Sequence, residues 1–249
     1  MNDVAPVAPL EEKPLTEVER VVDTFIAPVK TFTDIRRNTS WWVPWLLMSI
    51  FGLGMVFVVD KKLGLDTVYE NQLRMSPKQM DKFEQLPPDQ KANQVRIGAS
   101  ITKYFSYGSP VLTIVFIGVI AGILMATFNF GFGAEVKFPQ ALAISMYAFL
   151  PSILKSLIAI AVVAAGGAEG FTFQNPVASN LGGLVDPNSS HFLYSILVGL
   201  DVFAIWTLVL TGIGYSCVTR LKRGTCMGVV FGWWAVVTLI GAGIGALFS

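Results

Sequence analysis

The sequence contains few of the side chains that bind metals or form covalent cross-links. Its 249 residues include one histidine and two cysteines, whereas metal centres and disulfide frameworks normally show as clusters of these residues. The Gly-x-Ser-x-Gly turn that carries a nucleophilic serine is missing, and no glycine-rich phosphate-binding loop follows a strand pattern. We therefore predict no catalytic, metal-binding or cofactor-binding residues and no enzymatic activity.

Charge is scarce as well, and neither sign dominates. Only 14% of the residues are charged and the net charge is +1, whereas soluble domains are roughly one quarter charged and nucleic-acid-binding proteins carry a marked basic excess. The hydrophobic fraction is 53% and the mean hydropathy is +0.59. This composition excludes an ordinary soluble domain and a nucleic-acid partner, and it indicates an integral membrane protein surrounded by a lipid bilayer.

The apolar residues are concentrated in five long stretches that are almost free of charge. Each stretch supplies the roughly 20 residues that a helix needs to cross the bilayer, and a helix satisfies its own backbone polar groups in lipid. The sequence therefore predicts an all-α integral membrane fold, a five-transmembrane-helix bundle within residues 41–249. The predicted spans are about 42–59, 111–132, 140–165, 192–218 and 226–248.

Lysine and arginine near the ends of these spans give the expected orientation. Arg36, Arg37, Lys137 and the basic turn of residues 220–223 fall on one side, whereas the 166–191 loop contains no lysine or arginine. Short loops rich in these residues stay in the cytoplasm, so we predict a cytoplasmic N-terminus and a C-terminus outside. The 60–110 loop has mixed charge and is long enough to be translocated regardless of it.

Two segments precede the first predicted span. Residues 1–14 are rich in proline and are predicted to form a disordered tail. Residues 15–40 are predicted to be a cytoplasmic amphipathic segment that begins at a Thr16/Glu19 capping box and bends or divides at Pro28. It could lie on the membrane surface, bind a partner or pack against the ends of the bundle. Its apolar face would carry Leu15, Val18, Val21, Val22, Phe25, Ile26, Val29, Phe32 and Ile35, and its polar face Glu17, Glu19, Arg20, Asp23, Lys30 and Asp34.

Lys155 and Asp201 are the two ionisable residues within the predicted spans. A charged side chain at the centre of a membrane helix costs roughly 2.5–3.5 kcal/mol on translocon scales, so neither should face lipid. Each lies about ten residues from the outer end of its span, and at 1.5 Å per residue this places both roughly 15 Å deep. Matching depth on antiparallel helices predicts an ion pair. We favour a structural pair over an ion pathway, because a pathway normally has more than one polar group per span.

Tryptophans and glycines complete the pattern of the predicted membrane helices. Trp41, Trp42 and Trp45 at the start of the first span are expected to form an interfacial aromatic belt. Small residues spaced by four allow helices to approach closely, and we favour packing within one chain over a dimer face; a homo-oligomer is possible but nothing in the sequence supports it. These pairs are Gly118 and Gly122, Gly228 and Gly232, and Gly241 and Gly245.

Two stretches resemble the bacterial branch of the Yip family, the Ypt/Rab-interacting multi-pass membrane domain. The first is APVKTF at residues 27–32 followed by WWVPWLL at residues 41–47. The second is LDVFAIWTLVL at residues 200–210, followed by GIG at residues 212–214. It is similar to the aspartate-phenylalanine-tryptophan helix of that family. The resemblance runs from about residue 20 to the end of the chain.

The resemblance implies a five-span bundle in the bacterial cytoplasmic (inner) membrane, with no known catalytic activity. Asp201 and Trp206 are the positions that the resemblance carries over, as helix-packing elements, and we also expect Gly212 to be a helix-packing position. Eukaryotic relatives bind Rab-type GTPases, but their Asp-Leu-Tyr-Gly-Pro motif is missing here, so GTPase binding is not carried over. We expect a non-enzymatic scaffold that binds membrane or cytoplasmic protein partners or organises the membrane. The alternative is a small transporter or channel that uses the Lys155/Asp201 pair.

Overall fold

The computed structural model describes residues 13–167, 169–185 and 190–248. Within these ranges the secondary structure is helical and contains no strand, apart from one isolated bridge between Asn180 and Asp201. The predicted tail of residues 1–14 lies almost entirely outside the described part. The described residues form two compact units, the first within the ranges 1–49, 110–152 and 205–234, and the second within 50–109, 153–204 and 235–249.

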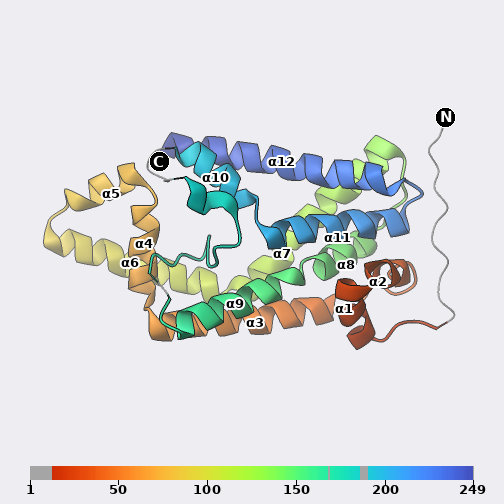
Figure 1. The fold of residues 1–249 in the computed structure, drawn as a ribbon, viewed down its shortest axis with the longest axis horizontal. Helices are drawn as coiled ribbons and strands as arrows, with labels where there is room; N and C mark the ends of the chain where they lie inside the picture. The colour runs from red at the N-terminus through yellow and green to blue at the C-terminus, as the bar shows by residue number, and fades with distance from the viewer. Residues whose placement is uncertain (1–12, 168, 186–189, 249) are drawn as a thin grey trace. The chain divides into compact units, whose positions relative to one another are not determined.

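The first unit contains the N-terminal helices and the packing around Tyr215. Phe128 stacks on Tyr215 with ring centroids 4.3 Å apart. A side chain at position 214 would overlap Ile144, so the close approach there requires Gly214. Helices α1 and α2 lie beside α8 (Figure 1). The helices of this unit are α1 (Glu17–Ile26), α2 (Pro28–Asp34), the start of α3 (Trp42–Lys62), α7 (Ser109–Ala126), the π-helix η1 (Thr127–Gly131), α8 (Phe138–Ala148), most of α11 (Val202–Val218) and the start of α12 (Arg223–Phe248).

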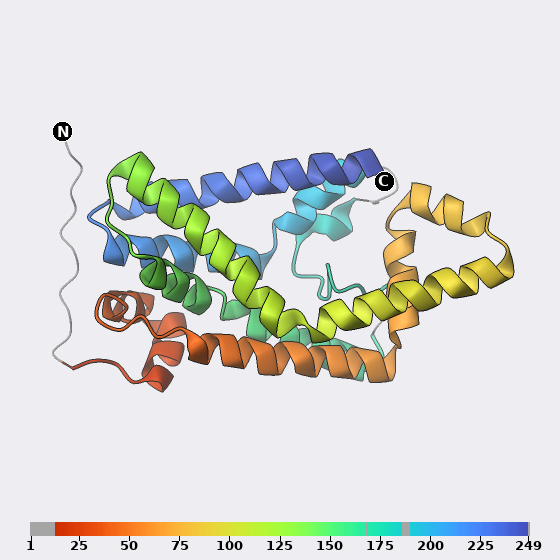
Figure 2. The same cartoon turned by 180° about the vertical axis from the view of Figure 1, so that it is seen from behind.

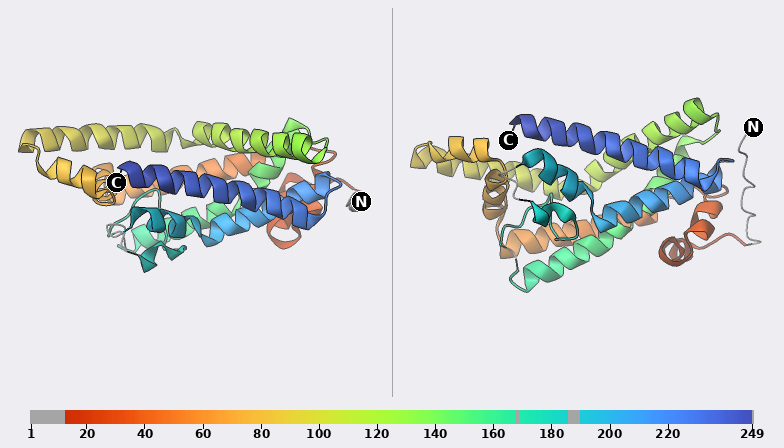
Figure 3. Two further views of the ribbon diagram at one scale, coloured as in Figure 1. Left: turned by 90° about the horizontal axis from the view of Figure 1, so that it is seen from above. Right: turned by 45° about the horizontal axis from the view of Figure 1, so that its top comes forward.

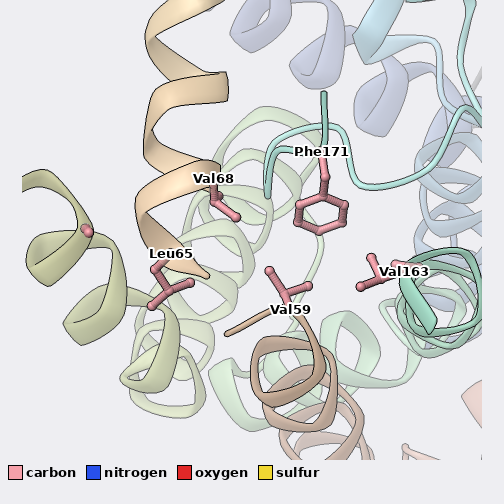
Figure 4. Packing of buried hydrophobic residues seen from close by; sticks show 7 residues of the cluster. Val59, Leu65, Val68, Val163 and Phe171 are labelled. Carbon is pink, nitrogen blue, oxygen red and sulfur yellow. The ribbon is translucent and has the colours of Figure 1, made fainter. Parts of the chain in front are cut away.

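The second unit contains the rest of α3 and α12 together with five further α-helices. They are α4 (Leu65–Arg74), α5 (Pro77–Glu84), α6 (Pro88–Tyr107), α9 (Pro151–Ala164) and α10 (His191–Gly199), and a 3-10 turn η2 (Leu181–Leu184) packs on α10 (Figure 3). Helix α4 packs across α6 (Figure 2). The apolar core of this unit includes Val59, Leu65, Val68, Val163 and Phe171 (Figure 4).

Among the residues that the structure describes, four segments are long and apolar enough to cross a membrane: Trp42–Lys62, Ser109–Gly131, Phe138–Ala164 and Arg223–Ala246. They correspond to four of the five predicted spans. The remaining apolar helix, Val202–Val218, has 17 residues, fewer than the roughly 20 that a straight span needs. The chain is thus an all-helical, multi-pass membrane protein, and the five-span count stays a prediction.

The predicted span 192–218 is wrong as a single helix. The structure divides it into α10 and α11, with a break at Leu200 and Asp201. Asp201 Oδ1 accepts hydrogen bonds from the backbone N–H groups of Phe203 and Ala204, at 2.9 and 3.1 Å. These are orphan donors at a helix start, so Asp201 caps α11. Residues 192–218 are almost entirely apolar, so their hydropathy gave no sign of this break. The break coincides with the one charged side chain in the segment, Asp201, which caps α11.

The predicted span 140–165 also contains a discontinuity. Helix α8 ends at Ala148 and α9 begins at Pro151. Proline lacks the backbone N–H that would continue the helical hydrogen-bond ladder, but it suits the first position of a new helix. The apolar character continues across the break, and the combined segment Phe138–Ala164 is still long enough to span a bilayer.

Candidate functional site

Arg20 organises a buried polar cluster in the first unit. Its guanidinium is fully buried, and Nε donates to Asp34 Oδ2 at 3.0 Å. Nη1 and Nη2 donate to the backbone carbonyls of Ser40, at 3.4 Å, and Asn38. Asp34 is 2% exposed and also accepts from Arg37 Nε at 2.6 Å. The guanidinium thus ties α1 to the end of α2 and to the residues that lead into α3.

Helix α8 completes this cluster through Tyr147. The Tyr147 hydroxyl donates to Glu17 Oε2 at 2.8 Å, and the Arg20 guanidinium lies 5.4 Å from the centre of the Tyr147 ring, within the range of a cation–π contact. We call Glu17, Arg20, Asp34 and Tyr147 the N-terminal anchor. It fixes α1 to α8, which follows it in the sequence by more than one hundred residues.

The anchor determines which side of α1 faces the interior. The sequence places Arg20 on a solvated polar face, but the structure buries Arg20 and Thr24. Val18, Val22 and Ile26 are instead 73%, 48% and 74% exposed. These three residues are spaced by four and share one face of the helix, which we call the α1 apolar stripe. Of the three alternatives for the apolar face, packing against the ends of the bundle does not apply to these positions, because the paired guanidinium and carboxylate take the interior.

The predicted capping box is present at the start of α1. The Thr16 hydroxyl accepts from the Glu19 backbone N–H at 3.3 Å, and the Glu19 carboxylate accepts from the Thr16 backbone N–H at 2.7 Å and from its hydroxyl at 2.8 Å. These bonds favour the charged carboxylate. The backbone bond, followed by the hydroxyl bond, lowers the pKa of Glu19 below its ordinary value of 4.5.

Acidification is therefore expected to loosen the start of α1. Because the folded pKa of Glu19 is lowered, its stabilising contribution is complete above pH 4.5 and is lost as the pH falls through the folded value. Hydrogen exchange at the first-turn amides, corrected for intrinsic rates, should rise on acidification below pH 4.5. Glu19→Gln keeps an acceptor without a titrating group, so exchange in this variant should not show that rise; an equal rise in both proteins would contradict the assignment.

The second polar cluster brings the predicted pair Lys155 and Asp201 together. Lys155 Nζ lies 3.0 Å from Asp201 Oδ2, and Asp201 is buried. The hydroxyl of Ser179 donates to the same oxygen, and the backbone N–H of Val202 donates to the Ser179 carbonyl at 3.0 Å. With its two capping bonds, Asp201 joins α9, the start of α11 and the loop before η2. Its acceptor capacity is used by these contacts, which suits a structural role better than proton abstraction.

The other predicted packing residues occupy three different environments. The Trp206 ring meets Phe25 of α1 edge-on, with centroids 5.6 Å apart. A side chain at position 212 would overlap Met227, so Gly212 allows α11 and α12 to approach closely. Trp41 and Trp45 contact each other edge-on at 6.4 Å, and Trp45 Nε1 donates to the Pro110 carbonyl at 2.9 Å. Trp42 is the exposed member of the predicted belt.

Most of the paired glycines do not lie at the close helix contacts that we expected within one chain. A Cβ built at Gly118, Gly228, Gly232 or Gly241 would meet no atom within 4 Å among the neighbours that the structure describes. Gly122 only reaches Phe138 at 4.0 Å, whereas Gly245 lies close to His191. The preference for intramolecular packing is therefore wrong for most of these positions, because small residues permit a close approach without requiring one.

Sequence reasoning missed the central role of Arg20 and the participation of Ser179. Arg20 lies among charged residues at ordinary helical spacing, so its sequence context is that of a solvated side chain. Ser179 lies in a loop whose composition is explained by turn formation alone. The general rule that a buried charge needs a partner could have indicated that Arg20 and Asp201 have partners. It could not identify those partners, because they come from other parts of the sequence.

Neither cluster provides the free base, nucleophile or ligand set of an enzyme site. The carboxylates of Asp34 and Asp201 both accept bonds from cationic groups. In the described ranges, no three His, Cys, Asp or Glu side chains are grouped so that they could hold a metal ion. What both arrangements can do is fix helices: the N-terminal anchor holds α1, and the Asp201 cluster holds the start of α11.

Comparison with known proteins supports the family resemblance across nearly the whole chain. The search of curated proteins and the search of solved structures each found no match. The profile of the Yip1 domain, in contrast, matches residues 22–244. This range includes Asp34 and Asp201, three of the membrane-capable segments and all but the last two residues of the fourth, whereas Arg20 precedes it. This chain is a multi-pass membrane protein that belongs to the Yip1 domain family.

Proposed function

We propose that the protein is a non-enzymatic membrane scaffold that engages the cytoplasmic leaflet of the bacterial inner membrane through the α1 apolar stripe. In this proposal the bundle has five spans, with the N-terminus in the cytoplasm and the C-terminus outside, and α11 crosses together with α10. The observation that carries the proposal is that α1 is fixed by its polar face while Val18, Val22 and Ile26 stay exposed.

The position of α1 favours lipid as the occupant of the stripe. Arg20 bonds to the carbonyls of Asn38 and Ser40, immediately before Trp41 and the start of a membrane-capable helix. Tryptophan at such a position is typical of the membrane interface. Helix α1 is therefore held at the level where its apolar face could enter the boundary between headgroups and acyl chains, about 5–10 Å deep.

Depth measurements on the intact protein in lipid nanodiscs test this proposal. An environment-sensitive fluorophore is attached through Val22→Cys or, as a matched control, through Asp23→Cys; the native Cys217 and Cys226 are buried. Successive helical residues differ by about 100° in direction, so only the label at position 22 should be quenched strongly by brominated acyl chains. Equal quenching at both positions, or quenching at neither, would remove the membrane-surface role.

The transporter alternative makes a different prediction for the same preparation. A scaffold should give no ion or solute flux in reconstituted liposomes. Reproducible flux that disappears in Asp201→Asn would overturn the scaffold proposal and assign the buried pair to a conduction pathway. If the label is quenched at position 22 and no flux occurs, cross-linking in native membranes is the direct route to protein partners.

A further inference from the structure

A groove lies between α4 and α6 in the second unit, and none of its lining residues belongs to either polar cluster. Its volume is about 650 Å³, and it is lined by residues of these two helices and by Leu86, which precedes α6. Pockets for small ligands range from about 300 to 1,000 Å³. The groove is therefore large enough for a small organic molecule of one or two rings.

The wall of this groove depends on one glycine. Gly98 of α6 is buried, and a Cβ there would overlap three carbons of the Tyr69 ring. The absence of a side chain lets the aromatic ring of α4 lie directly against α6. Gly98 and Tyr69 both line the groove, so this contact places an aromatic surface at its wall.

The polar groups around the groove are neutral. Residues 60–110 contain eight basic and six acidic residues, yet none of these fourteen lines the groove. Four carboxamides line it instead, together with the phenol of Tyr69 and the hydroxyl of Thr102. The carboxamides are Gln72, Gln90, Asn93 and Gln94. An ionic ligand would find no opposite charge among the lining residues, so the lining selects for an uncharged molecule.

We propose that this groove binds a neutral sugar, free or as the headgroup of a glycolipid. A carboxamide offers both hydrogen-bond donors and an acceptor, which matches hydroxyl groups that both donate and accept. In the part of the chain that is described, the side chains of Gln72, Gln90 and Gln94 make no hydrogen bond of their own and are available to a ligand. Ile97 and Ile101 add apolar surface for the C–H faces of a sugar ring.

A peptide fits the groove less well than a sugar. Extended peptides usually bind at a free sheet edge, and helical peptides bind through a row of apolar anchors in a hydrophobic groove. The described residues of this unit form no sheet, and four of the ten residues that line the groove are carboxamides, which interrupt any row of apolar anchors. The proposal does not depend on the scaffold function or on the placement of α1.

Binding is tested with the full-length protein in nanodiscs prepared without glycoside detergent, which would compete. Saturation-transfer NMR and calorimetry are used with maltose, cellobiose and N,N′-diacetylchitobiose, and a second arm places monoglucosyl diacylglycerol in the nanodisc. We expect at least one neutral sugar to bind. Gln72→Leu and Gln94→Leu should each weaken that binding by about threefold to tenfold, the range for one lost hydrogen bond.

The control is Gln85→Leu, which removes an exposed carboxamide of the same segment outside the groove and should leave binding unchanged. Gly98→Val should abolish binding by displacing Tyr69. If that variant does not fold, Gln72→Leu still decides the question, because Gln72 is exposed. Binding of the free sugar identifies a soluble ligand, and binding only in the lipid arm identifies a glycolipid. No binding in either arm, equal loss in Gln85→Leu, or binding only of an uncharged peptide would overturn the proposal.

Discussion

Replacing Arg20 with methionine is expected to release α1 from the rest of the first unit. Methionine keeps part of the apolar volume but removes the guanidinium that pairs with Asp34 at 3.0 Å, bonds to two backbone carbonyls and lies over Tyr147. Breaking a buried ion pair on one side costs about 3–5 kcal/mol, because the partner charge stays buried. Asp34 would keep Arg37, which places the expected cost near the lower end of this range.

Hydrogen exchange in nanodiscs measures this effect locally. A loss of about 3 kcal/mol in docking free energy corresponds to roughly 10²-fold faster exchange through local opening, and it should be confined to residues 17–37. Exchange in α7 and α12 should change little. Unchanged exchange in α1 would show that the guanidinium does not hold the helix.

Two further variants separate the anchor from a general effect of charge. Arg96→Met removes an exposed arginine of α6 that bonds to Asn93 and should leave exchange in α1 unchanged. The double variant Arg20→Met/Asp34→Leu removes both buried charges, and it should lose less stability than the sum of the single variants. A double variant that loses the full sum would mean that the two side chains act independently.

Replacing Asp201 with leucine is expected to destabilise the second unit strongly. The carboxylate pairs with Lys155, accepts from Ser179 and caps α11 with two backbone bonds. Asp201→Leu leaves Lys155, whose side chain is 23% exposed, without its partner and leaves two N–H groups at the helix start unsatisfied. We expect a loss of about 3–5 kcal/mol, seen as a lower thermal midpoint in detergent.

Lys155→Met should cost less than Asp201→Leu, because the remaining carboxylate keeps Ser179 and its capping bonds. The double variant Lys155→Met/Asp201→Leu should be more stable than the sum of the single effects predicts, since it leaves no unpaired charge. Lys103→Met, at an exposed position of α6, is the control for charge removal. If the double variant shows simple additivity, Lys155 and Asp201 are not coupled and the proposed pairing fails.

The two buried clusters differ in how far the sequence could anticipate them. Lys155 and Asp201 stand out because they interrupt apolar stretches, and the cost of an isolated charge in such surroundings points to a partner at similar depth. Arg20 and Asp34 lie in a segment with many charges, where a solvated side chain is the ordinary expectation. The rule that buried charges need partners applies to both pairs. However, the sequence indicates burial only for Lys155 and Asp201, because only these two lie within apolar stretches.

Some helix boundaries could likewise be predicted from the sequence, and others could not. The capping box at Thr16 and the division at Pro28 are confirmed, because they depend on a few neighbouring residues and local backbone chemistry. The break at Leu200 and Asp201 depends on Ser179 and Lys155 as well, and these residues reach Asp201 only after the chain has folded. Residues 192–218 therefore look continuous in the sequence and form two helices in the structure.

By itself the sequence determined that this protein belongs in a membrane, where its long apolar helices lie, and where two charges must avoid lipid. These properties follow from hydropathy and helix geometry, which act along the chain. Only the tertiary structure decided that α1 turns Arg20 inward and leaves Val18, Val22 and Ile26 exposed. The reason is energetic, because a charged side chain can be buried only when it is paired and hydrogen-bonded. The fold brings Asp34, Tyr147 and two backbone carbonyls to Arg20, and the sequence alone does not show that these groups meet.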